Sequence, residues 1–92
     1  MKTTYLFEYN MPNMEKDHIE YTTETAKNAK AALITILDEI ENLNLDDSVK
    51  ETICNKYNLE DIVDFCRIIF RFDVRAIYNV GSCIYVKDED EF

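Results

Sequence analysis

The chain has 92 residues, 47% of them hydrophobic, and its 19 acidic against 10 basic residues give a net charge of −9. This size allows one domain with a modest core, and the apolar content argues against intrinsic disorder. The negative charge repels DNA, RNA and anionic lipids, so we expect no direct binding to nucleic acid or membranes. No apolar run approaches the roughly 20 residues that span a bilayer, and Glu8 interrupts any signal-peptide core. We therefore expect a soluble, cytoplasmic protein.

The first 25 residues predict a β-hairpin. Aromatic residues occupy every second position of residues 4–9, which is typical of a strand. A loop over residues 10–17 contains the only proline, and residues 18–25 alternate again. We expect an antiparallel hairpin whose apolar side receives the following helix. On the second strand, the residues that share one side are Ile19, Tyr21, Thr23 and Thr25.

Residues 28–43 predict the helix around which the domain is organised. Apolar residues recur there at steps of three and four, which gathers them on one helical face. Asn28 is suited to cap the helix, because its side-chain oxygen can accept an unpaired amide of the first turn. The residues of the apolar stripe are Ala29, Leu33, Ile36, Leu37, Ile40 and Leu43.

Two further helices are expected before the chain returns to strands. Asp46 or Asp47 caps the first of them, whose apolar positions are Val49, Ile53 and Tyr57. Asn58 caps the second, which has acidic residues in its first turns and arginines toward its end, as the helix dipole favours. Its stripe consists of Leu59, Ile62, Val63, Cys66, Ile69 and Phe70.

The last third of the chain predicts a second pair of strands. Residues 68–72 are β-prone yet also continue the helical stripe, and we favour a break around Phe72–Asp73. Strands are then expected over residues 74–79 and 82–87, with Gly81 in the turn, followed by an acidic tail at 88–92. The predicted fold is one α+β domain over residues 1–87, with the order ββ-α-α-α-ββ. Its antiparallel sheet has about four strands, with helices packed on one face.

Enzymatic chemistry finds little support in the sequence. The single glycine excludes Gly-rich phosphate loops, and His18, the only histidine, has no evident third group to orient it. The carboxylate pairs fall on predicted polar helix faces, and the spacing of a calcium loop is missing. We therefore expect a protein that is not an enzyme and that uses no cofactor.

The three cysteines indicate a reducing compartment. Cys54, Cys66 and Cys83 are odd in number and form no CxxC pair, and two of them fall on predicted apolar helix faces. Free, buried thiols fit this pattern best. A zinc site built from the three cysteines and His18 is an alternative, but the spacing matches no standard zinc module. We expect no metal site.

The negative charge is concentrated in the second part of the chain. Residues 1–37 carry five acids and four bases, a net −1, whereas residues 38–92 carry fourteen acids and six bases, a net −8. A compact group of carboxylates resembles a row of phosphates to a basic groove and promotes fast, salt-sensitive association. The candidate partner-binding residues are Asp38, Glu39, Glu41, Asp46, Asp47, Glu51, Glu60, Asp61 and Asp64.

In size and composition the chain resembles small inhibitors encoded by phages and plasmids, among them anti-CRISPR proteins and other DNA mimics. This resemblance implies a partner that is a basic, nucleic-acid-binding protein, such as a nuclease or effector complex in the host cytoplasm. An immunity protein or antitoxin is an alternative of the same kind. A further alternative is a homo-oligomeric or scaffold domain whose acidity serves only solubility, including a homodimer formed through an edge strand such as residues 4–9.

Overall fold

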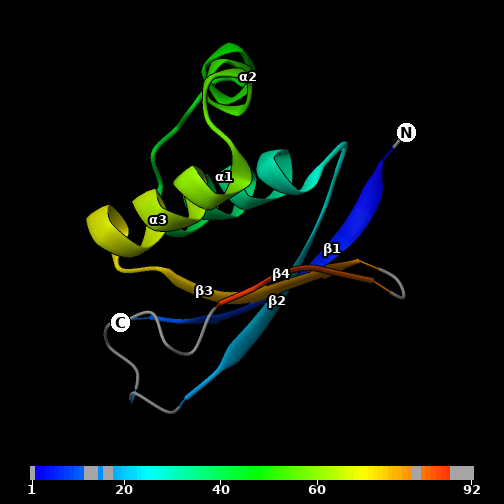
Figure 1. Cartoon of the computed structure of the whole chain (residues 1–92). Coiled ribbons are helices and arrows are strands. Elements are labelled where there is room, and N and C mark those ends of the chain that lie inside the picture. The colour runs from blue at the N-terminus through cyan, green and yellow to red at the C-terminus, as the bar shows by residue number, and fades with distance from the viewer. Residues whose placement is uncertain (1, 12–14, 16–17, 80–81, 88–92) are drawn as a thin grey trace.

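The structure is a computed structural model that describes residues 2–11, 15, 18–79 and 82–87. Three helices lie above a four-stranded sheet (Figure 1). The order of elements confirms the predicted α+β fold. The elements are β1 (Thr3–Asn10), β2 (Glu20–Ala26), α1 (Ala29–Glu41), α2 (Asp47–Lys56), α3 (Leu59–Phe70), β3 (Asp73–Asn79) and β4 (Ser82–Val86).

All neighbouring strands pair antiparallel, in the order β2-β1-β3-β4. β1 is therefore a central strand paired on both sides, and the expectation that residues 4–9 form an edge strand is wrong. The two central strands supply the most buried positions of the sheet, including Phe7, Val74 and Ile77. The helices cover a single face of this sheet, and α2 stands farther from it than α1 and α3 (Figure 1). The core therefore lies between the sheet and the inner sides of α1 and α3.

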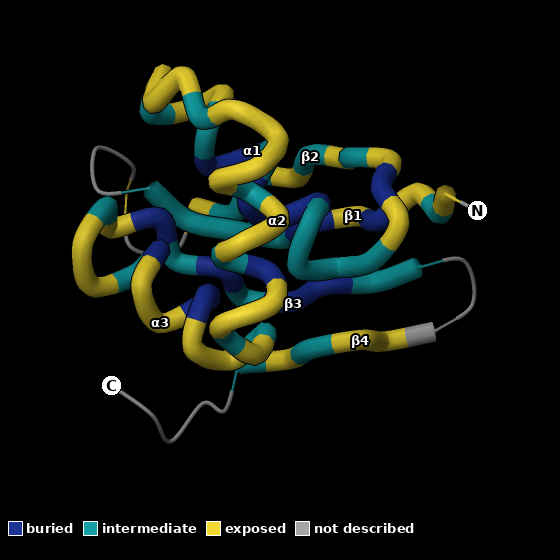
Figure 2. The backbone as a smooth tube through the Cα atoms, turned by 90° about the horizontal axis from the view of Figure 1, so that it is seen from above, coloured by how far each residue is buried: buried dark blue, intermediate teal, exposed yellow. Residues whose placement is uncertain are grey.

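Apolar burial is greatest where α1 meets the sheet. Leu33 of α1 is fully buried, as are Phe7 and Phe72. Removing one such side chain from water contributes roughly 2 kcal/mol, so these contacts supply much of the driving force for folding. Seen from the helical side, exposed positions recur along α3, and β4 at the sheet edge is largely exposed (Figure 2).

Each helix begins at a polar residue that the sequence identifies as its cap. The side-chain oxygen of Asn28 accepts the amide of Ala31 at 2.8 Å, and that of Asn58 accepts the amide of Asp61 at 2.8 Å. Asp46 caps α2, which decides between the two aspartates considered. These bonds satisfy amides that have no partner within the helix.

α3 ends by turning its chain back into the core. Arg71 adopts a left-handed conformation with φ 57°, and the amide of Phe72 donates to the carbonyl of Cys66 at 2.9 Å. This closure inserts Phe72 beneath the helix and starts β3 at Asp73. The helix thus ends slightly before the expected break, and Ile68 and Ile69 are helical.

The predicted orientation of β2 is wrong. The register pairs Phe7 with Thr22 and Tyr5 with Glu24, so Thr22 and Glu24 share the side of the sheet that faces the helices. Tyr21, with its neighbours Thr23 and Thr25, is exposed on the opposite side. Because β2 is an edge strand beside a central strand, the aromatic side chains of β1 fix which face is inside.

All three predicted helical stripes are only partly buried, and in that of α1 Ile40 and Leu43 are exposed. In α2 the buried residue is Cys54, whereas Val49 is exposed because α2 packs on α1 and not on the sheet. In α3 Ile62, Val63 and Cys66 are buried, but Ile69 is 64% exposed. The expected turn at Gly81, the tail at 88–92 and most of the first loop lie outside the described residues. None of the described helices has both the length and the apolar character needed to cross a bilayer.

Candidate functional site

An apolar groove opens on the outer side of the helical layer, where all three helices meet. Its volume is about 270 Å³. Its walls come from α1, α2, α3 and the connection between α1 and α2. The lining residues are Ile34, Leu37, Leu43, Leu45, Ile53, Ile62, Phe65, Ile69 and Phe70. All of these side chains are hydrocarbon, so the groove can bind an apolar surface but offers no side chain for acid–base or metal chemistry.

The connection between α1 and α2 is held in place by Asp38. Its carboxylate accepts the amide of Leu45 at 3.1 Å and pairs with the Lys50 ammonium at 3.2 Å. The hydrogen bond from Leu45, followed by the contact with Lys50, lowers the pKa of Asp38 below its usual value. Asn42 and Asn44 take left-handed conformations that bend the chain here. These contacts position Leu43 and Leu45 at the groove.

The corner between α2 and α3 is fixed by Lys30 of α1. Its ammonium donates to the carbonyl of Cys54 at 2.7 Å and to that of Tyr57 at 3.2 Å, so it binds carbonyls at the end of α2. The ring of Tyr57 then meets the ring of Phe65 edge-on, with 5.1 Å between centroids. This aromatic contact orients the side of α3 that lines the groove.

Apolar surface continues from the groove over the outer side of α3. Ile68 is 67% exposed and Ile69 is 64% exposed, while Phe65 is 38% exposed. Ile68 and Ile69 each neighbour Phe65 on the helix surface, since they lie three and four positions after it. The described structure therefore has an uncovered apolar strip on α3 next to an apolar groove.

Three of the nine predicted acidic residues have side-chain partners among the described residues. Besides Asp38, the carboxylate of Asp46 accepts the Ser48 hydroxyl at 2.7 Å and the Val49 amide at 2.9 Å, and these bonds lower its pKa. Asp64 pairs with Arg67 at 3.1 Å. Asp38 and Asp46 therefore stabilise the fold locally. The sequence indicates the capping role of Asp46 but not the local role of Asp38.

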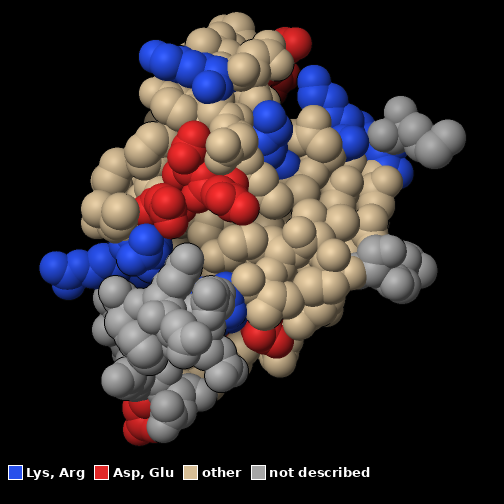
Figure 3. Space-filling model, viewed as in Figure 1, with Lys and Arg blue, Asp and Glu red and all other residues tan. Residues whose placement is uncertain are grey.

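The remaining six carboxylates are distributed over all three helices. No described lysine or arginine nitrogen lies within 4.0 Å of them. Acidic side chains gather over α3, with basic side chains above and below them (Figure 3). Two acids adjoin the groove, because Glu41 lies one turn after Leu37 and Asp61 one turn before Phe65. The six residues are Glu39, Glu41, Asp47, Glu51, Glu60 and Asp61.

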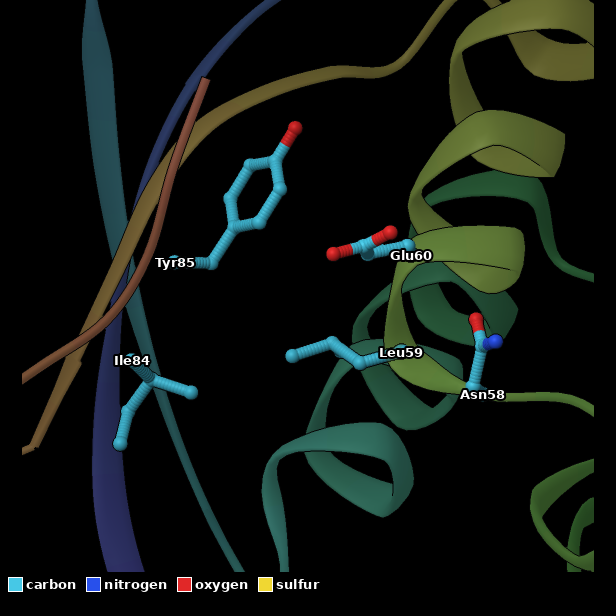
Figure 4. Close-up of a pocket in the computed structure, with 5 residues that line it drawn as sticks. All are labelled: Asn58, Leu59, Glu60, Ile84 and Tyr85. Carbon is cyan, nitrogen blue, oxygen red and sulfur yellow. The ribbon is translucent and has the colours of Figure 1, made fainter. Parts of the chain in front are cut away.

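A second hollow lies between the start of α3 and β4 (Figure 4). Its volume is about 340 Å³, and Asn58, Leu59, Glu60, Ile84 and Tyr85 line it. The Glu60 side chain projects from the helix toward the strand that carries Tyr85 (Figure 4). Asn58 is already occupied as the cap of α3. The described lining includes one carboxylate, Glu60, and one phenol, Tyr85, and no histidine or cysteine.

The sheet face opposite the helices carries a mixed surface. The Tyr21 hydroxyl donates to the Glu8 carboxylate at 3.2 Å, and this bond raises the pKa of Tyr21. Partial burial, followed by the nearby Glu8 charge, raises the pKa of Tyr78. Leu6 and Val86 are exposed on the same face. The exposed threonines Thr23 and Thr25 lie on this face too, so its apolar side chains are mixed with polar ones.

The histidine and the cysteines do not converge. His18 Nε2 lies 2.6 Å from the Glu20 carboxylate on the protein surface. Cys54 and Cys66 are buried and free as expected, but Cys83 is exposed, because it lies on the edge strand. Burial raises the pKa of Cys66 to about 12, which keeps that thiol protonated. Within the described ranges no three His, Cys, Asp or Glu residues are placed to hold a metal ion.

The groove was missed at the sequence level, although one signal for it was present. α3 has more apolar positions than a single buried face can hold, because Phe65 and Ile68 fall outside its predicted stripe. Comparison with known proteins adds no functional assignment: no family model matches the chain, and no characterised protein or solved structure matches it significantly.

Proposed function

We propose that this chain is a non-enzymatic, acidic binding protein that docks on a cationic protein through the groove and the outer side of α3. The observation that supports this most directly is the exposure of Ile68 and Ile69 on α3 beside the apolar groove, which Ile69 also lines, in a chain of net charge −9. Apolar patches bordered by polar residues are typical of protein–protein contact sites. Charged groups around such a patch accelerate the encounter and select the partner's charge.

The form of this function that best fits the charge is inhibition of a basic, nucleic-acid-binding protein. The net charge of −9 gives the molecule a field that attracts a surface evolved to bind phosphates. A nuclease or effector complex bound in this way would be blocked from its nucleic acid. The protein would then act in the cytoplasm of the cell that contains its target, as inhibitors of the anti-CRISPR type do.

A homodimer is the second candidate, because the same exposed isoleucines would be covered by another copy. Against it stands charge repulsion, since each copy would bring −9 to the contact. The two candidates differ in a simple measurement. A binding protein for cationic targets remains a monomer by light scattering from micromolar to millimolar concentration, whereas the dimer shows a mass that rises with concentration.

DNA cleavage by a panel of purified CRISPR effector nucleases and restriction endonucleases tests the inhibitor form. We expect inhibition of at least one enzyme, which weakens steeply as salt rises from about 50 to about 300 mM because screening shortens the reach of the charges. The double variant Glu41→Lys with Asp61→Lys should lose this inhibition. A matched control, Glu20→Lys with Glu24→Lys, changes the net charge equally but lies on β2.

Two results would contradict the proposal. Equal loss of inhibition in both double variants would mean that net charge acts without a specific docking surface. An unaffected panel would overturn inhibition of nucleases as the function.

A further inference from the structure

We infer that the groove binds a cationic amphipathic helix of the partner protein. The inference rests on the proposed function and specifies the part of the partner that makes the contact. Three properties of the groove lead to it: the chemistry of its walls, its length and the charges at its ends.

The walls favour a helix over an extended segment. Every lining residue is apolar, and most of them belong to α1, α2 or α3, whose backbone groups are bonded within each helix. An extended peptide in this groove would leave its own amides and carbonyls without partners, at a high cost in free energy. A helix satisfies its backbone internally and presents side chains alone, as in other helix-in-groove complexes.

The length of the groove matches two helical turns. Along α3 the lining runs from Ile62 through Phe65 to Ile69. These seven steps correspond to about 10 Å of helix. Apolar residues at positions i, i+3 or i+4, and i+7 of a bound helix cover the same distance. An amphipathic helix therefore offers three anchors to this wall at a spacing that its own geometry sets.

The charges next to the groove favour a cationic occupant. Glu41 and Asp61 adjoin it, and neither has a described lysine or arginine within 4.0 Å. Nearby bases are engaged, since Lys50 pairs with Asp38 and Arg67 pairs with Asp64. Lys56 lies over the Tyr57 ring, and Arg71 is an exposed base beyond the last turn of α3. Over the whole chain 19 acids stand against 10 bases, so the overall field attracts a cationic occupant and repels a second copy of this chain.

The test uses three synthetic 18-residue peptides and fluorescence anisotropy. One peptide has leucine on one helical face and lysine elsewhere, and the second replaces every lysine by glutamate. The third has the composition of the first, with the leucines spread around the helix. At about 50 mM salt we expect the amphipathic lysine peptide to bind about tenfold more tightly than either control, because it alone combines the apolar face with opposite charge.

Protein variants then locate the contact. Ile68→Ser with Ile69→Ser should weaken binding of the lysine peptide about tenfold, because it removes apolar area from the contact. Both side chains are about two-thirds exposed, so the variant should retain its thermal stability. The matched control, Tyr21→Ser with Val86→Ser, removes two exposed apolar residues from the opposite sheet face and should bind like the original protein.

Specific outcomes overturn the inference. Equal binding of the two lysine peptides would show charge attraction without use of the groove, and equal binding of the glutamate peptide would exclude a cationic occupant. A dimer that disappears in the Ile68/Ile69 variant would identify a second copy as the occupant.

Specific peptide binding combined with an unaffected nuclease panel would support the inference and refute nuclease inhibition. Nuclease inhibition without specific peptide binding would support the inhibitor and refute the groove's occupant.

Discussion

α1 and α3 are built alike but are covered differently. Both begin at an asparagine cap with a 2.8 Å bond to the amide three residues on, and both end at a residue in the left-handed conformation. In α1 the large apolar residues Leu33, Ile34 and Leu37 are buried. In α3 Ile68 and Ile69 remain about two-thirds exposed, although they are as apolar as the residues of α1.

The difference shows that the position of a helix in the layer decides what its apolar residues do. α1 contacts β2 below and both other helices beside it, so most of its apolar positions are covered, although Ile40 is 39% exposed. α3 contacts α1 and β3, and no described element covers its outer side. Burial therefore accounts for most apolar residues of α1 but not for Ile68 and Ile69 of α3, which the proposed docking role would explain.

Thiol reactivity separates the inner side of α3 from the surface most strongly. Cys83 is exposed and should react rapidly with a thiol reagent. Cys66 lies on the inner side of α3, where burial raises its pKa to about 12. We expect it to react at least about 100-fold more slowly, because it becomes accessible only when the helix opens. Mass spectrometry after timed alkylation measures this, and comparable rates would refute the packing of α3.

Removal of side chains should show the same contrast in stability. Leu33→Ala deletes a fully buried side chain of α1 and should reduce the free energy of unfolding by about 3 kcal/mol. Ile69→Ala in α3 should change it by less than about 0.5 kcal/mol, as exposed substitutions usually do. Urea denaturation of both variants gives the comparison. If Ile69→Ala is as destabilising as Leu33→Ala, the outer side of α3 belongs to the core and not to a binding surface.

The caps should contribute similarly, because each accepts the amide three residues on at 2.8 Å, although φ is −156° at Asn28 and −83° at Asn58. Asn28→Ala and Asn58→Ala should each reduce the free energy of unfolding by about 1 kcal/mol, through loss of the bond to the third amide. Thermal unfolding monitored by circular dichroism detects this change. Substitution of either asparagine by aspartate keeps the acceptor and serves as the control, with little change expected. A large effect at only one helix would mean that the two ends differ in packing.

The smallest effect concerns the loop that follows α1. The Leu45 amide and the Lys50 ammonium hold the pKa of Asp38 below its usual value of 3.8. In the unfolded chain this carboxylate binds a proton more readily, so its stabilising contribution is present above about pH 4 and is lost as the pH falls through the lowered pKa. Asp38→Asn should therefore flatten the fall in stability between about pH 4 and pH 2. Lys50→Met should flatten it less, because the Leu45 bond remains.

Local chemistry explains which features the sequence could predict. The caps at Asn28 and Asn58 depend on one side chain and an amide three residues away, so they are visible in a short segment. The break near Phe72 was predicted because the helical and strand patterns conflict there. The sidedness of β2 was predicted incorrectly, since Tyr21 is more apolar than Glu24 but the pairing with β1 decides which of them faces the helices.

The candidate site depended on contacts between elements and could be predicted only in part. The nine acidic residues were predicted from their charge alone. Asp38, however, holds the loop after α1 through its hydrogen bond with the Leu45 amide, which the charge pattern does not reveal. The groove requires α2 to be placed by Lys30 and α3 by the Tyr57–Phe65 contact. The Lys30 bonds join residues 24 and 27 positions apart, and the aromatic contact spans the corner between α2 and α3. A periodic pattern of apolar residues predicts neither contact.

The most direct test of the binding role of α3 is a map of amide chemical shifts during titration with the amphipathic lysine peptide. We expect the largest changes at Leu43, Phe65 and Ile69, which line the groove, and small changes along β2. Changes concentrated on Tyr21 and the open face of the sheet, or spread evenly over all acidic residues, would contradict the account.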